Sequence, residues 1–125
     1  MLVKDIVNCI DAQPLLINDQ SIFNKEFEAA FASDLMSDVL ALIQHKPETV
    51  VLVTGLCNAQ VLRTAEMLDL QLIIFVRGKE MSDEMLETAK YSDVNVFTTY
   101  HTLYETCGML YKLGLNGYED LDPSL

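Results

Sequence analysis

One stretch of the chain, Thr49–Arg77 (TVVLVTGLCNAQVLRTAEMLDLQLIIFVR), restricts the possible folds more than any other. It contains two continuous apolar runs, Val50–Val53 and Leu72–Val76, whose β-branched residues are typical of strands covered on both faces. Between these runs, apolar residues recur at helical spacing after Asn58, a common helix N-cap. The stretch therefore predicts a β-α-β unit of a parallel sheet, with the Thr54-Gly55 turn at the carboxyl edge of its first strand.

The alternation of strands and helices continues after this stretch. Ser82 is a typical N-cap, the acidic residues after it suit the first turn of a helix, and Gly114 is a typical residue at a helix end. The expected elements are a helix from Ser82 to about Lys90, a strand over Val94–Phe97 and a helix from about His101 to Leu113. Together they make a β-α-β-α-β-α core over residues 49–115, which predicts the α/β class, with a small, mostly parallel sheet flanked by helices.

The chain before residue 49 adds further elements to this core. Their expected ranges are a helix over Met1–Ala12, short strands over Leu15–Ile17 and Phe27–Ala32, and a helix that Ser33 or Asp34 caps and that reaches about Gln44. Residues 116–125 are polar and acidic, and they predict a frayed tail. Because 125 residues are enough for one domain, we expect a single domain over residues 1–125, composed of segment 1–48, core 49–115 and tail 116–125.

The charge of the chain argues against several kinds of partner. Nineteen acidic residues against eight basic ones give a net charge of −11, and such a field repels phosphate backbones and anionic membranes. No apolar run approaches the roughly 20 residues that span a bilayer, and the N-terminal sequence MLVKDIVNCIDAQ lacks a secretory signal pattern. We therefore expect a cytoplasmic protein that binds neither nucleic acid nor membranes.

Cysteines and histidines do not form a recognisable metal-binding pattern. Cys9, Cys57 and Cys107 are widely spaced, which predicts neither a disulfide framework nor a zinc site. His45 and His101 are not accompanied by an H-E-x-x-H motif or by clustered carboxylates. No metal site and no cofactor are expected.

Three loops should meet at the carboxyl edge of the parallel sheet, where ligands of such folds bind. The first offers backbone N–H groups at a helix N-terminus, the second brings two of the eight basic residues, and the third adds hydroxyls and an imidazole. Together they are candidates to hold a phosphate or a carboxylate. The candidate ligand-binding residues are Thr54, Gly55, Cys57, Asn58, Arg77, Gly78, Lys79, Thr98, Thr99 and His101. In an alternative interpretation the glycines only serve tight turns and the threonines only cap helices.

Sequence motifs of known catalysts are missing. The segment TGLCNAQ is neither a Walker A loop nor a G-x-G-x-x-G fingerprint, so kinase or ATPase activity has no support. Cys57 precedes a predicted helix, whose dipole would lower the pKa of the thiol. A redox role for Cys57 would need a base or a resolving cysteine, and Cys107 is a candidate for the latter. The other interpretation is that Cys57 is a turn residue, and we expect no enzymatic activity.

Several segments resemble the DRTGG domain family. The segment VTGLCNAQVLRTAEMLDLQLIIFVRG is similar to the central part of these domains, and VFTTYHTLYETCGMLYKLGL and SDLMSDVL resemble the matching pieces of stand-alone members. Such proteins are often labelled as related to the N-terminal domain of HPr kinase. Thr54, Gly55 and Gly78 match residues of the family's two turns. Leu56-Cys57 replaces the usual Asp-Arg, and Gly78-Lys79 replaces the Gly-Gly.

The resemblance implies a small α/β domain without catalytic activity, often dimeric, of the kind that acts as a regulatory module beside CBS domains in a pyrophosphatase. Stand-alone members are associated with hydrogenase and electron-transfer genes. The helix before residue 45 and the helix from about His101 have apolar residues on more than one face, which favours a homodimer. The stripe of Tyr104 and Tyr111 on the later helix indicates packing in the core or at an interface.

The leading functional prediction is a non-catalytic regulatory or ligand-binding domain that senses an anionic ligand such as an adenine nucleotide at the carboxyl edge. The alternative is a protein-interaction module that docks on a metabolic or electron-transfer enzyme. A redox protein that uses Cys57 is a third hypothesis.

Overall fold

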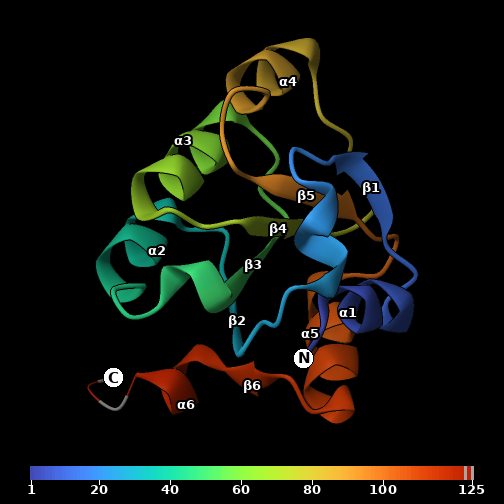
Figure 1. Cartoon of the computed structure of the whole chain (residues 1–125), viewed down its shortest axis with the longest axis vertical. Coiled ribbons are helices and arrows are strands. Elements are labelled where there is room, and N and C mark those ends of the chain that lie inside the picture. Colours follow the sequence, from blue (N-terminus) through green and yellow to red (C-terminus); the bar gives the residue numbers. More distant parts are fainter. Residues whose placement is uncertain (123, 125) are drawn as a thin grey trace.

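A single six-stranded sheet forms the centre of the computed structural model, which describes residues 1–122 and 124. The strand order is β1-β5-β4-β3-β2-β6, and the strands β2 to β6 run parallel, whereas β1 lies antiparallel to β5 at one edge (Figure 1). The strands are β1 Gln13–Leu16, β2 Ala29–Ala32, β3 Val50–Thr54, β4 Leu72–Phe75, β5 Asn95–Thr98 and β6 Asn116–Gly117. The expected fold class, a mostly parallel sheet flanked by helices, is confirmed.

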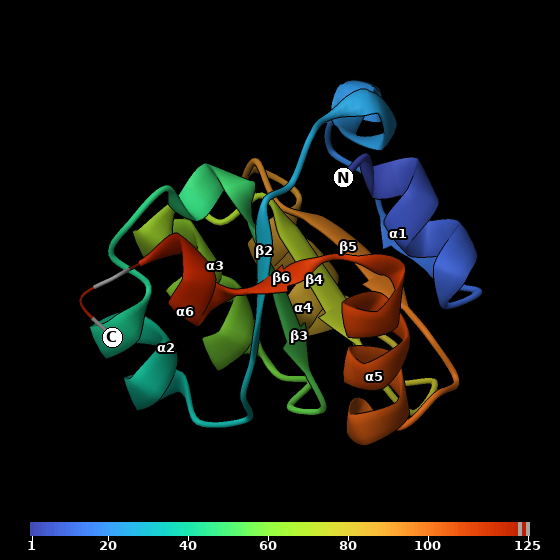
Figure 2. The same cartoon turned by 90° about the horizontal axis from the view of Figure 1, so that it is seen from below.

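Helices cover both faces of the sheet. Helices α2 (Met36–Leu42), α3 (Ala59–Leu68), α4 (Asp83–Ala89) and α6 (Tyr118–Leu121) supply buried residues to the core on one face. Helices α1 (Val3–Cys9) and α5 (Leu103–Leu113) supply them to the core on the other. Figure 2 shows the sheet with α2, α3 and α6 on one side and α1 and α5 on the opposite side. Two 3₁₀ turns, Gln20–Asn24 and Pro47–Thr49, complete the described elements.

The central stretch folds as the sequence predicts. Val50 and Leu52 pack into the core beneath α3, whereas Val51 and Val53 pack into the core beneath α1 and α5. Strand β3 is therefore buried on both faces, which explains its continuous apolar sequence. Strands β3 and β4 pair in parallel from Val51 opposite Leu72 onward, and β5 adds to β4 in the same direction.

Most of the predicted helix ends are also confirmed. The side chain of Asn58 accepts a hydrogen bond from the N–H of Val61, and Ser82 does the same for Met85. Gly114 ends α5 with a φ of 113°, a left-handed conformation that suits glycine. Helix α5 begins later than expected, because the side chain of Thr102 caps it.

The helix predicted to start at Ser33 or Asp34 begins instead at Met36. Its N-cap is Leu35, and no side-chain hydrogen bond caps the helix. The hydroxyl of Ser33 accepts from the N–H of Leu35 at 3.0 Å, so it closes a turn before the helix. Asp34 is directed elsewhere, to the loop after β3.

The prediction of a frayed tail from residue 116 is wrong for the described part of that segment, while residues 123 and 125 lie outside it. Strand β6 pairs with β2, and Tyr118 of α6 is buried at 2% exposure. The hydroxyl of Tyr118 accepts hydrogen bonds from the backbone N–H groups of Gln44 and His45 at 2.9 and 2.8 Å. One buried tyrosine therefore anchors a segment that is otherwise polar. None of the helices in the described residues has the length and apolar character needed to cross a membrane.

Candidate functional site

Four loops meet at the carboxyl edge of the parallel strands. They follow β2, β3, β4 and β5, and their residues are Ser33–Leu35, Gly55–Asn58, Val76–Glu80 and Thr99–Thr102. Because the strands are neighbours in the sheet, the structure brings together the three loops predicted from the sequence. It adds a fourth loop, which contains Asp34.

The carboxylate of Asp34 occupies the Thr54-Gly55 turn. Its Oδ1 atom accepts hydrogen bonds from the backbone N–H of Gly55 at 2.7 Å and from the hydroxyl of Thr54 at 3.0 Å. The Thr54 oxygen in turn accepts from the N–H of Leu56 at 3.1 Å. The protein thus supplies its own anion to the donors that the sequence predicts for a ligand. In the sequence, an aspartate between a strand and a helix is interpreted as a helix cap. No sequence pattern therefore indicates the contact of Asp34 with the Thr54-Gly55 turn.

The turn after β4 has an unusual backbone. Arg77 and Gly78 both have left-handed conformations, with φ values of 61° and 66°. Hydrogen bonds to the loop after β5 hold this turn, because the N–H of Arg77 donates to the carbonyl of His101 at 2.8 Å and that of Gly78 to the carbonyl of Thr99 at 2.7 Å. A β-carbon at Gly78 would lie 3.0 Å from the ring of Tyr100. The backbone of Arg77 is therefore tied down, although its side chain is exposed.

Arg77 and Asp34 approach the same point from different loops. A β-carbon added to Gly55 would lie 3.4 Å from a guanidinium nitrogen of Arg77 and 3.5 Å from both carboxylate oxygens of Asp34. Within residues 1–122 and 124, the ion pairs join other groups, and neither Arg77 nor Asp34 belongs to one. Because Gly55 has no side chain, the space beside it stays open. The charged groups of Arg77 and Asp34 both lie near this space, and they do not form an ion pair with each other.

Two other predicted site residues, Thr99 and Asn58, have internal hydrogen-bond partners. The hydroxyl of Thr99 donates to the carbonyl of Ile10 at 2.6 Å, and the side chain of Asn58 caps α3. Thr98 is buried, and its hydroxyl lacks a hydrogen-bond partner among the described residues. Arg77, Lys79 and His101 therefore remain as the predicted residues with a positive charge or an imidazole to offer to a ligand.

Cys57 lies in a more apolar environment than the sequence predicts. Its sulfur donates to the carbonyl of Glu80 at 3.3 Å and lies 3.8 Å from the sulfur of Met85. Burial raises the pKa of the Cys57 thiol, and the charge of Lys79 opposes that rise only in part. The expected lowering of the pKa by the helix dipole is thus wrong. Cys57 packs against the core on the α3 face, whereas Cys107 lines a cavity on the α5 face, so Cys107 is not placed to act as a resolving cysteine.

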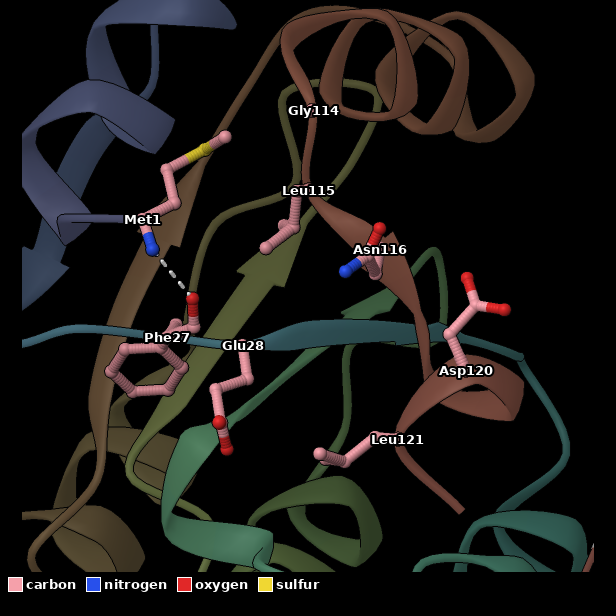
Figure 3. A pocket seen from close by; sticks show the side chains of 8 residues that line it. All are labelled: Met1, Phe27, Glu28, Gly114, Leu115, Asn116, Asp120 and Leu121. Carbon is pink, nitrogen blue, oxygen red and sulfur yellow. Dashed lines mark hydrogen bonds between the residues drawn. The ribbon is translucent and has the colours of Figure 1, made fainter. Parts of the chain in front are cut away.

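Three cavities surround the short strand β6, at a sheet edge for which the sequence predicts no binding site. One of them has a volume of about 280 Å³ and lies between the N-terminus and the start of β2. Figure 3 shows this pocket, with the nitrogen of Met1 donating to the carbonyl of Phe27 and with the carboxylates of Glu28 and Asp120 in its wall. The two carboxylates outnumber the single ammonium group of Met1 in the wall, which disfavours an anionic ligand here. The other two cavities flank the outer edge of β2.

Metal-binding clusters are not found within the described part of the chain, where no three His, Cys, Asp or Glu side chains come together.

Comparisons with known proteins support the fold. No family model matches the chain, and no curated protein sequence matches it. One similar solved structure is the crystal structure of the CBS and DRTGG domains of the regulatory region of Clostridium perfringens pyrophosphatase, complexed with its activator, diadenosine tetraphosphate. The match has a TM-score of 0.67 at 20% sequence identity and covers 87% of this chain and 45% of that chain. At this identity the likeness supports a DRTGG-like fold for the chain.

Proposed function

We propose that the chain is a regulatory domain without catalytic activity of its own, and that it binds an anionic ligand such as an adenine nucleotide at the carboxyl edge of its sheet. The observation that carries this proposal is the side chain of Arg77, which lies beside Gly55 without an ion pair among the described residues. In a chain with a net charge of −11, a cation that makes no direct ion pair with a carboxylate among the described residues favours a functional interpretation.

The surroundings of Arg77 suit a phosphate group. A guanidinium presents a planar fork of donors that matches two phosphate oxygens, and Lys79 follows two residues later in the same loop. His101 comes from the neighbouring loop, whose carbonyl fixes the backbone of Arg77. Asp34 lies on the other side of Gly55, where a carboxylate is an acceptor for ligand hydroxyls such as those of a ribose.

The structural neighbour gives independent support for a nucleotide. That structure is a regulatory region crystallised with a dinucleotide activator, and 45% of that chain shares its fold with this one. We therefore extend the role of a regulatory nucleotide-binding domain to this protein as a proposal.

A thermal-shift experiment tests the proposal directly. The panel contains adenosine mono-, di- and triphosphate, diadenosine tetraphosphate and inorganic phosphate. A ligand at 100 times its Kd should add about 2.7 kcal/mol to the free energy of unfolding. Arg77→Met keeps the length of the side chain and removes its charge, so it should abolish the shift.

The matched control is Lys112→Met, which removes a positive charge from the last turn of α5 and should leave the shift unchanged. A flat response to the whole panel, or equal shifts in the wild-type protein and Arg77→Met, would contradict the proposal.

Two further predictions from the sequence stay open to experiment. The homodimer is a prediction that sedimentation at several protein concentrations tests. Docking on another protein is favoured by one specific observation, the groove along the outer edge of β2.

A further inference from the structure

Strand β2 has an open edge. Strand β6 pairs with Ala29 and Ala30 and then ends, because Gly117 leads directly into α6. Phe31 and Ala32 consequently have a strand neighbour on the β3 side only. Ala32 is exposed, in contrast to the fully buried residues opposite it on β3. The N–H of Ser33 donates to the carbonyl of Val53 on β3, and backbone groups of successive strand residues point to opposite sides. The backbone groups of Ala32 therefore face outward, where they are able to pair with an additional strand.

Two cavities meet at this open edge, one on each face of the sheet. The larger one, of about 740 Å³, lies on the α2 and α6 side, and its walls include Phe31, Leu42 and Tyr118. The smaller one, of about 190 Å³, lies on the α5 side, and its walls include Val53, Cys107 and Leu110. Ala30, Ala32, Tyr111 and Gly117 line both cavities. We call the two together the β2 groove.

The helices on either side of the β2 groove expose large apolar residues. Leu35 and Leu42 are seven residues apart at the start and end of α2, and Tyr104 and Tyr111 are seven apart on α5, so each pair shares one helix face. Tyr111 is 72% exposed and Tyr104 is 83% exposed. Apolar side chains gathered beside an open strand edge mark an interaction surface better than isolated exposed residues do.

The charges beside the β2 groove are acidic. Glu119 and Asp120 belong to its walls, and these are the charged residues among the described residues that line either cavity. Asp38 lies one turn before Leu42 on the same face of α2. A partner that carries positive charge at its ends is therefore favoured, and an acidic one is repelled.

We infer that the β2 groove binds an extended, basic segment of a partner protein, which adds to the open edge of β2 as a further strand. Successive side chains of a strand point to opposite faces. The bound segment therefore places one apolar side chain in the cavity beneath α5 and the next one in the groove beside α2. Its lysine or arginine residues lie against Glu119 and Asp120. This mode is strand addition, in which backbone hydrogen bonds supply affinity and the two cavities supply specificity.

The charge of a second copy of this chain makes it a less favourable partner for the β2 groove than a basic segment. It would bring a net charge of −11 and its own Glu119 and Asp120 to an acidic surface. The β2 groove does not include Arg77, because β3 separates β2 from the strand that leads to that residue.

Selection from a library of random short peptides tests the inference without a known partner. The expected result is enrichment of peptides that combine lysine or arginine with apolar or β-branched residues at alternate positions. A synthetic peptide from the enriched pool is then measured by fluorescence anisotropy. Its affinity should fall with rising salt concentration, as expected for charge pairs at a surface.

Two pairs of variants locate the binding surface. Tyr111→Ser should weaken the peptide by about tenfold or more. Its control is Tyr91→Ser, which removes an even more exposed tyrosine outside the groove and should have no effect. The double variant Glu119→Gln and Asp120→Asn should weaken binding and flatten its salt dependence. The double variant Asp83→Asn and Glu84→Gln, in the first turn of α4, is its control.

Failure of the selection to enrich any peptide, enrichment of acidic peptides, or binding that tolerates Tyr111→Ser would overturn the inference. So would a dimer of the chain that Tyr111→Ser converts to a monomer, because the groove would then hold a second copy. Arg77→Met should abolish nucleotide binding but leave peptide binding unchanged. The two proposals can therefore fail independently of each other.

Discussion

Oδ1 of Asp34 lies 2.7 Å from the backbone nitrogen of Gly55, across two neighbouring loops of the carboxyl edge. The same oxygen accepts the hydroxyl hydrogen of Thr54. These are the donors that make a Thr-Gly turn attractive to an anion, and a side chain of the protein already uses them. An external anion at this edge therefore has to bind on the Arg77 side or displace Asp34.

Replacement of Asp34 should destabilise the fold modestly. Asp34→Ala leaves the Gly55 N–H and the Thr54 hydroxyl without their acceptor, and we expect a loss of about 1 kcal/mol in the free energy of unfolding. Urea denaturation measures this loss. Asp38→Ala is the control, because Asp38 is an exposed residue of α2 and should change stability by less than about 0.5 kcal/mol. Equal effects of the two variants would show that the contact contributes little.

Two glycine replacements should have opposite effects on stability. Gly78→Ala forces a left-handed conformation on alanine and sets its β-carbon 3.0 Å from the ring of Tyr100, so we expect a loss of about 1–2 kcal/mol. Gly108→Ala lies in α5, where the new β-carbon meets no atom within 4 Å beyond its own helix backbone and chain neighbours, and we expect a gain of up to about 1 kcal/mol. Thermal unfolding distinguishes the signs. A neutral Gly78→Ala would mean that the turn relaxes freely.

The hydroxyl of Tyr118 should contribute substantially to the free energy of unfolding, although it lies near the end of the chain. Tyr118→Phe removes the acceptor for the N–H groups of Gln44 and His45, which should cost about 1–3 kcal/mol. Tyr111→Phe, which removes an exposed hydroxyl, is the matched control and should be neutral. Hydrogen exchange at Gln44 and His45 provides a second measurement, since both amides should exchange faster in Tyr118→Phe. Unchanged exchange would contradict the role of Tyr118 as an anchor.

The Cys57 thiol should react slowly at neutral pH. Its pKa is raised by burial, so the reactive thiolate is rarer than in a free thiol at the same pH. In a variant with Cys9→Ser and Cys107→Ser, iodoacetamide should alkylate Cys57 more slowly than it alkylates glutathione. The rate should rise as the pH increases towards the raised pKa. Alkylation faster than that of glutathione would revive the redox hypothesis.

Local features of the fold were predictable from the sequence. The apolar runs at Val50–Val53 and Leu72–Val76 indicated buried strands, because short apolar runs rich in β-branched residues are typical of strands covered on both faces. Asn58, Ser82 and Gly114 indicated helix ends, since the groups that they satisfy lie within a few residues of them. The three loops at the carboxyl edge followed from the order of these elements and from the direction of parallel strands.

Only the tertiary structure shows which distant residues contact one another. Asp34 and Gly55 are 21 residues apart in sequence, and Tyr118 and Gln44 are 74 apart, so no local pattern announces either contact. The polar composition of residues 116–122 indicated a frayed tail, because a single buried tyrosine is invisible among acidic neighbours. The β2 groove likewise depends on where β6 ends against β2.

The sequence by itself thus determined the class of fold and the edge at which charged loops gather, because strand burial and helix capping are short-range properties. Contacts between distant segments decided which of the charged groups in these loops remain available to a ligand. Asp34 uses the donors of the first turn, whereas the guanidinium of Arg77 is left without an ion pair among the described residues, and only the packed chain distinguishes the two.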